Sequence, residues 1–343
     1  MKQLLNTLYV TSHGAYLAKD GETIVVKHEG DTKIQVPVHT LGGVVCFGGV
    51  GFSPALLGLC AERGVAVSFL TEAGKFLARV NGPVSGNVLL RREQYRRADD
   101  LLSAAELARV MVAAKVSNCR GVLLRALRDH PECVGAEELS AATARLEEAV
   151  QRLEEPAPLD TVRGIEGDAA QAYFSVFDHL IVAQKDGFRF AGRNRRPPLD
   201  PVNGLLSFLY TLLRHDIAAA LEGVGLDPAV GFLHRDRPGR PGLALDLMEE
   251  LRPALADRLA LSLINRQQVK PEGFHVTESG AVMMTDDTRK EVLVAYQKRK
   301  QEEIQHPFLE EKIEVGLIPH VQALLLARHL RGDLDGYPPM IWR

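Results

Sequence analysis

Apolar and polar residues alternate along the first part of the chain, which is the pattern of strands with one buried face. Asp20-Gly21 and Glu29-Gly30-Asp31 punctuate this region as hairpin turns. Ser53 is a favourable N-cap in front of Pro54, and the pair predicts a short helix that stops near Gly64. The predicted strands cover residues 8–10, 15–17, 23–26, 33–38, 44–47, 65–70 and 75–80.

From residue 88 onward, apolar residues recur at a spacing of three and four, which predicts amphipathic helices. Gly, Pro and Ser cluster just before this point, as is typical of a linker. We therefore expect an α+β fold with a small β-rich domain (1–82) used for dimerisation. A large all-helical domain (83–343) follows, beginning with a linker (83–90). The predicted helices cover residues 101–128, 136–153, 162–183, 201–222, 291–304 and 316–330.

The chemically densest stretch is Val230–Arg252, which reads VGFLHRDRPGRPGLALDLMEELR. It places His234 in a turn rich in Gly, Pro and Arg. It then begins a helix in which Asp246, Glu249 and Glu250 lie within about one turn of each other. An imidazole and carboxylates brought together are the ligands expected for a divalent metal such as Mn²⁺, Mg²⁺ or Zn²⁺. An apolar stripe runs beside these acids and consists of Leu243, Leu247, Leu251 and Leu255.

Another candidate acid, Glu166, lies upstream in RGIEGDAAQAYF, with Gly164 and Gly167 close on either side. Glycine in a helix costs on the order of 1 kcal/mol relative to Ala. Such a cost is tolerated where another group must approach the backbone closely. The alternative is that Glu166 is a first-turn glutamate, which the helix dipole favours.

The other candidates also have structural interpretations when each is taken alone. A single histidine such as His234 is more often a hydrogen-bonded structural residue than a ligand. Asp246 and Glu249 could belong to a solvated helix face, where acidic residues usually lie. Pro253 follows them inside the helical pattern and predicts that the helix ends or kinks there. Only their combination within one helical domain favours a functional site.

Composition narrows the class of protein. With 343 residues and 46% hydrophobic content, the chain is long and apolar enough for two domains with real cores. Four dispersed cysteines without a CxxC pair are typical of reduced thiols in a cytoplasmic protein. We find no window of about 18 continuous apolar residues and no signal peptide, and so expect a cytoplasmic protein without a membrane span.

A net charge of −3 excludes a uniformly basic protein but not local basic patches. Arginines gather around the candidate acids, where they could bind the phosphates of DNA. For a single arginine, a solvated loop is the better interpretation, whereas two clusters beside one site favour DNA contact. The candidate DNA-binding residues are Arg163, Arg193, Arg195, Arg196, Arg235, Arg237 and Arg240.

Three long motifs, in this order, carry a resemblance to a known family. They are RGIEGDAAQAYF, GRNRRPPLDPVNGLLSFLYTLL and VGFLHRDRPGRPGLALDLMEELRP. With them the chain resembles the CRISPR-associated endonuclease and integrase family, the metal-dependent enzymes of spacer acquisition. It is most similar to the type I-C branch. The resemblance extends over essentially the whole chain, because the β-rich start and the helical remainder also match the family plan.

The resemblance implies that Glu166, His234 and Glu249 are catalytic metal ligands. Asp246 matches another acidic position of the family and is an alternative third ligand. Carboxylates with one imidazole suit Mg²⁺ or Mn²⁺. A zinc site is less expected, since no cysteine or HExxH pattern accompanies these residues.

The resemblance also implies the reaction and the partners. A metal-dependent DNA endonuclease and integrase would capture short duplexes and join their 3′-hydroxyl ends into a CRISPR repeat array. Its expected partners are double-stranded DNA, a second copy of the chain in a homodimer, and the smaller second adaptation protein. Two alternatives stay open: a metal nuclease that only hydrolyses DNA, and a non-catalytic DNA-binding scaffold.

Overall fold

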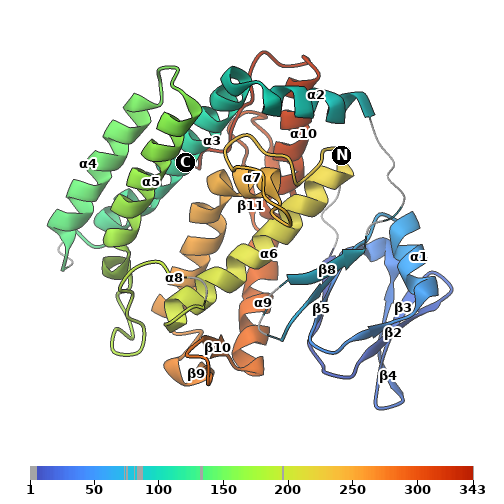
Figure 1. Ribbon diagram of the computed structural model, residues 1–343. Helices are drawn as coiled ribbons and strands as arrows, with labels where there is room; N and C mark the ends of the chain where they lie inside the picture. The colour runs from blue at the N-terminus through green and yellow to red at the C-terminus, as the bar shows by residue number, and fades with distance from the viewer. Residues whose placement is uncertain are drawn as a thin grey trace.

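The computed structural model describes residues 6–72, 74, 76–80, 82, 88–131, 134–194 and 197–342. A β-rich region comes first and a mostly helical region follows, so the α+β prediction is confirmed (Figure 1). In the described part of the chain, no helix combines the length and apolar character needed to cross a membrane.

The N-terminal region contains two sheets and one helix. Its elements are β1 (Asn6–Val10), β2 (Tyr16–Asp20), β3 (Thr23–His28), β4 (Asp31–Pro37), β5 (Leu41–Phe47), β6 (Gly51–Phe52), α1 (Pro54–Glu62), β7 (Ala66–Leu70) and β8 (Phe76–Val80). One sheet has the order β1-β5-β7-β8 and the other β4-β3-β2-β6. Leu17 and Ile24 of the second sheet share a buried core with Val44 of the first and Leu56 of α1. As predicted, Ser53 caps α1 by accepting a hydrogen bond from the Leu56 amide.

The remainder of the described chain is mostly helical. Its helices are α2 (Val88–Asp99), α3 (Leu101–Asp129), α4 (Ala136–Arg152), α5 (Leu159–Ser175), α6 (Pro201–Gly223), α7 (Gly242–Arg252), α8 (Arg258–Asn265), α9 (Asp286–Gln301) and α10 (Ile318–Leu330). The short strands β9 (Phe274–Val276) and β10 (Val282–Met284) form one hairpin, and β11 (Glu303–Gln305) and β12 (Lys312–Glu314) form another.

The sheet region packs directly onto the helices and shares a core with them. Val45, Phe47 and Leu70 belong to the same buried cluster as the apolar faces of α3 to α6. The rings of Phe47 and Phe208 lie 5.8 Å apart across this contact. Figure 1 shows β5 and β8 on the side of the sheets that faces α6. The β region is therefore fixed against the helix that forms one wall of the functional site.

Several predicted boundaries differ from the structure. The helix expected over 162–183 begins earlier and ends at Ser175, and a 3₁₀ turn over Phe177–Leu180 follows. Residues 83–87 of the predicted linker lie outside the described residues, whereas 88–90 already belong to α2. The hairpins β9–β10 and β11–β12 also interrupt the region expected to be all-helical, because strands of three residues carry too little periodicity to be recognised.

The α-helix α7 ends at Arg252, directly before Pro253, so the predicted helix end is confirmed. A π-helical turn over Pro253–Asp257 joins α7 to α8. A wider turn accommodates a residue that cannot donate the ordinary helical hydrogen bond. The apolar stripe from Leu243 to Leu255 is consequently continuous and fully buried.

Candidate active site

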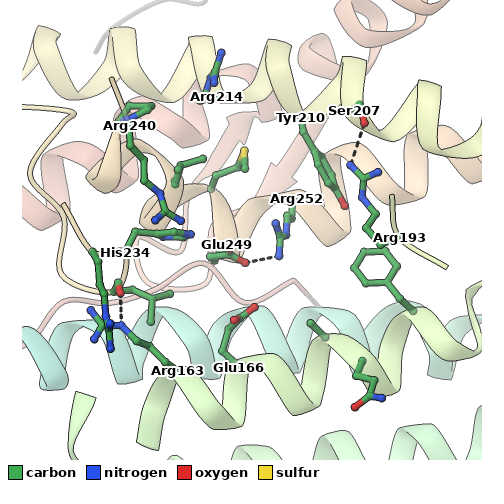
Figure 2. A pocket seen from close by; sticks show the side chains of 18 of the residues that line it. Arg163, Glu166, Arg193, Ser207, Tyr210, Arg214, His234, Arg240, Glu249 and Arg252 are labelled. Atoms are coloured by element: carbon green, nitrogen blue, oxygen red, sulfur yellow. Dashed lines mark hydrogen bonds and ion pairs between the residues drawn. The ribbon is translucent and has the colours of Figure 1, made fainter. Parts of the chain in front are cut away.

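An open cavity of about 1610 Å³ lies between α5, α6, α7 and the loop that precedes α7. Figure 2 shows the side chains of Glu166, His234 and Glu249 directed toward the same part of this cavity. They come from segments far apart in the sequence, so only the fold brings them together. The charged and aromatic residues lining the cavity include Arg163, Glu166, Arg193, Tyr210, Arg214, His234, Arg235, Arg237, Arg240, Glu249 and Arg252.

The three acids of α7 are buried, so the interpretation of a solvated helix face is wrong. Asp246 and Glu250 are completely inaccessible, and Glu249 is 3% exposed. Glu166 lies in the third turn of α5, which begins at Leu159, so it is not a first-turn glutamate either. Its side chain is 26% exposed at the cavity floor. Dipole stabilisation and solvation therefore do not account for these positions.

A buried lysine joins the two carboxylates at the floor of the cavity. The ammonium group of Lys115, on α3, forms an ion pair with Glu166 and lies 2.7 Å from Oε2 of Glu249. One cation therefore contacts carboxylates from two different helices. This shared contact places Glu166 and Glu249 next to each other.

Arg252 provides a second cation at Glu249. Its guanidinium lies 2.6 Å from Glu249 Oε2 and 5.4 Å from the centre of the Tyr210 ring. Burial by itself would raise the pKa of Glu249, but the charges of Arg252 and Lys115 hold that pKa well below its ordinary value. Glu249 is therefore ionised at neutral pH.

Asp246 holds His234 in place. One carboxylate oxygen accepts hydrogen bonds from the amides of Phe232 and Leu233, at 2.6 and 2.9 Å. The other accepts the His234 amide at 3.0 Å and contacts its Nδ1 at 2.6 Å. Because Nδ1 is engaged, Nε2 is the ring nitrogen directed to an external ligand. Asp246 is thus saturated by the loop that it orders.

Two glycines allow this loop to lie close to the start of α7. A Cβ on Gly231 would come within 2.5 Å of an Asp246 carboxylate oxygen, and one on Gly242 within 2.7 Å of the Ala229 carbonyl oxygen. Neither contact is possible for a larger residue without moving the backbone. The glycines of the central motif therefore bring His234 to Asp246.

The donor chemistry fits a hard divalent cation, although the carboxylates already have counter-charges. Glu166 and Glu249 offer oxygens and His234 offers Nε2, the mixture that suits Mn²⁺ or Mg²⁺. Among the described residues, no three or more His, Cys, Asp or Glu side chains are already arranged as a group that could hold a metal ion. Lys115 and Arg252 occupy the carboxylates instead. Glu249 is better placed as a direct ligand than Asp246, because both carboxylate oxygens of Asp246 already contact the loop that carries His234.

The predicted arginines surround this floor. Arg163 donates to the Leu233 carbonyl at 2.7 Å and pairs with Asp160, which also pairs with Arg235. Arg193 lies 5.2 Å above the Tyr210 ring. Arg237 and Arg240 line the cavity as well, whereas Arg195 and Arg196 lie outside the described residues.

Sequence reasoning missed Lys115 and Arg252, the two cations at the carboxylates. The sequence pattern does indicate that Lys115 is buried, because this lysine falls on the apolar stripe of α3 between buried Met111 and Cys119. A lysine in such a position requires a buried anionic partner. The structure also places Tyr210 at the cavity wall, between the guanidinium groups of Arg193 and Arg252.

The fold and this site together define a class of protein. It is an α+β chain whose helical region holds two carboxylates and an imidazole in an arginine-rimmed cavity. Comparison with known proteins identifies the family. The profile described as "CRISPR associated protein Cas1" matches residues 8–298. The chain is 57% identical, over 343 residues and the whole of both sequences, to "CRISPR-associated endonuclease Cas1 1" of Chlorobaculum tepidum. It belongs to the Cas1 family of CRISPR-associated proteins.

Solved structures share the fold at lower identity. A structure titled "Casposase bound to integration product" is 21% identical, with a TM-score of 0.84, and the match covers 97% of this chain and 92% of that one. A "Cas6-RT-Cas1–Cas2 complex" is also 21% identical, with a TM-score of 0.83 over all of this chain and 36% of the other. The family prediction is confirmed, while the type I-C branch stays a prediction.

Proposed function

We propose that the protein is a metal-dependent DNA endonuclease and integrase of spacer acquisition, which joins the 3′-hydroxyl ends of captured short duplexes into a CRISPR repeat array. The observation that carries this proposal is the convergence of Glu166, His234 and Glu249 on one arginine-rimmed cavity. Relatives named as endonucleases and a casposase fold titled with an integration product support it.

In the proposed mechanism, Glu166, Glu249 and Nε2 of His234 would hold Mg²⁺ or Mn²⁺. When bound, the metal supplies charge that stabilises the transition state of phosphodiester attack. Asp246 keeps the imidazole oriented, because it fixes both Nδ1 and the amide of His234. Whether DNA is cut or joined depends on the attacking group, which is water in hydrolysis and a 3′-hydroxyl in integration.

The arginines position DNA across the cavity. Arg163 and Arg235 are held together by Asp160, so they present adjacent charges at the rim. Guanidinium groups bind phosphate oxygens in pairs and make binding dependent on salt. We propose double-stranded DNA as the substrate, with Arg193, Arg237 and Arg240 as further phosphate contacts.

We further propose a homodimer formed through the β-rich region and a complex with the smaller adaptation protein. The shared fold with a chain in a complex titled with Cas1 and Cas2 supports the second partner. Assignment to the type I-C branch rests on the three motifs of the sequence. The adaptation and interference genes beside the gene for this chain test that assignment directly.

The variant H234A tests the proposed chemistry. We expect it to abolish strand cleavage and joining while leaving duplex affinity largely intact, because His234 holds the metal and the arginines hold the phosphates. A duplex with free 3′-hydroxyls and a supercoiled target separate joining from hydrolysis, since only an integrase yields joined products. The control H275A removes an exposed histidine of β9, outside the cavity, and should retain activity.

The proposal is wrong if H234A remains as active as the wild type in the presence of Mn²⁺. Hydrolysis without joined products would leave a nuclease alone. Insensitivity of a wild-type reaction to EDTA would exclude metal dependence. DNA binding without any turnover by the wild type would leave only a scaffold.

A further inference from the structure

Lys115 is more deeply buried than Arg252, the other cation that contacts Glu249. The lysine side chain is 2% exposed, and it lies on the face of α3 that otherwise packs into the apolar core. A buried ammonium is strongly unfavourable unless anions compensate its charge. Glu166 and Glu249 provide that compensation.

The compensation is mutual. Two adjacent carboxylates would repel each other, and Lys115 lies in contact with both. With Arg252 at Glu249, the floor of the site carries two negative and two positive charges. It is therefore balanced without a divalent cation, which would add two further charges. Entry of a metal requires one of the resident cations to lose its contact.

Lys115 and Arg252 differ in the interaction partners that each would keep if its contact with Glu249 were lost. Arg252 also stacks on Tyr210 and interacts with the charge of Asp257, so it retains partners on its own side of the site. In the part of the chain that the structure describes, the ion pairs of Lys115 are those with Glu166 and Glu249. These carboxylates are also the ones proposed to bind metal.

We propose that Lys115 is an internal counter-cation, which neutralises Glu166 and Glu249 in the metal-free protein and competes with the divalent metal for their oxygens. This inference rests on the proposed function, because it assumes that these carboxylates are the metal ligands. In the metal-free state Lys115 keeps the site folded and charge-balanced. The same ammonium lowers the affinity for metal, since binding displaces it from the carboxylates.

Direct Mn²⁺ titration of the full-length protein, by calorimetry and by the electron paramagnetic resonance signal of free Mn²⁺, tests the proposal without an activity assay. K115M removes the charge and keeps much of the side-chain volume. We expect it to bind Mn²⁺ at least about tenfold more tightly than the wild type, because a buried positive charge beside the cation is lost. K115R keeps the charge and should bind no more tightly than the wild type.

K300M is the matched control. Lys300 is also a buried lysine, 8% exposed, and its Nζ lies 3.0 Å from a carboxylate oxygen of Asp216, outside the metal site. This variant should leave the Mn²⁺ affinity unchanged. Thermal denaturation adds a second measurement: metal-free K115M should melt below the wild type, and Mn²⁺ should raise its melting temperature more than that of the wild type or K300M.

An Mn²⁺ affinity of K115M equal to or weaker than that of the wild type would overturn the proposal. If K115M and the smaller K115Q fold only when Mn²⁺ is present, the counter-charge role is supported. If they fold neither with nor without it, the role is purely structural and the proposal is wrong. Wild-type Mn²⁺ binding that E249Q does not reduce would instead contradict the proposed function, because Glu249 would then not be a ligand.

Discussion

Glu249 and Glu250 are consecutive buried acids on α7 with opposite surroundings. Glu249 lies at the cavity floor between the cations Lys115 and Arg252. Glu250 faces α10 and the C-terminal segment and, among the described residues, accepts hydrogen bonds only from neutral donors. Those donors are the Tyr337 hydroxyl at 2.5 Å, the Met340 amide at 2.5 Å and the Gln322 amide group at 3.2 Å.

The pKa values of the two acids move in opposite directions. Burial raises the pKa of Glu250 to about 7, and its neutral donors only partly offset that effect. Burial acts on Glu249 too, but the charges of Arg252 and Lys115 outweigh it and lower the pKa. The partners rather than the degree of burial therefore distinguish an acid prepared for a cation from one that anchors the C-terminal segment.

The largest expected effect is the loss of activity in E249Q. The amide keeps the size of the side chain but cannot supply an anionic oxygen, so metal binding and strand cleavage should fall by at least about 100-fold. Cleavage and joining rates, with circular dichroism to verify folding, measure this effect. Activity within a few-fold of wild type would show that Glu249, like Glu250, is a structural acid.

The next effect is a loss of stability in E250A. Three donors from the C-terminal segment and α10 would lose their acceptor, which should lower the free energy of unfolding by about 3 kcal/mol. Urea denaturation at neutral pH measures the change, and activity per folded molecule should persist. E250Q should lose less, because its amide oxygen can still accept from Met340. A catalytic defect in folded E250A would contradict the separation of the two sides of α7.

The sequence predicted most elements because their periodicity and boundary residues are local. Ser53-Pro54 opens α1, and apolar spacing predicts α3, α4, α6 and α10 to within a few residues. Arg252 lies three residues after Glu249 on the same helix, so helical spacing could have indicated that pair. The contact of Glu249 with Lys115 could not be predicted this way, because it depends on the packing of α3 against α7. The same holds for Glu250, whose donors lie near the end of the chain.

The central motif was informative for a different reason. It contains His234, Asp246 and Glu249 within a short stretch, so their proximity was predictable. The separate roles of Asp246 and Glu249 were not, because both are acids on one helix and differ only in their contacts. Asp246 accepts the amides of a loop whose close approach depends on Gly231 and Gly242.

Asp257 sharpens the comparison, because its surroundings are intermediate between those of Glu249 and Glu250. It accepts the Tyr210 hydroxyl at 2.5 Å and also feels the charge of Arg252. Burial is the largest influence and raises its pKa from 3.8 to about 6. A carboxyl group whose pKa is higher in the folded state than in the unfolded state stabilises the protein at low pH. This contribution is lost as the pH rises from the unfolded pKa to the folded pKa.

D257N removes this titration, so the variant should gain stability relative to the wild type between pH 4.5 and 7.5. The expected change in the difference between their unfolding free energies is about 2 kcal/mol, measured by urea denaturation at both values. The control D160N alters an exposed acid. Hydrogen bonds from Arg163 and Arg235 lower the pKa of Asp160, so any pH-dependent change in the unfolding free energy of D160N relative to the wild type should have the opposite sign. If the difference in unfolding free energy between D257N and the wild type did not change with pH, the charges of the arginines would outweigh burial at Asp257, which would then resemble Glu249. If this difference rose with pH, Asp257 would resemble Glu250, as an acid whose pKa burial raises toward neutral values.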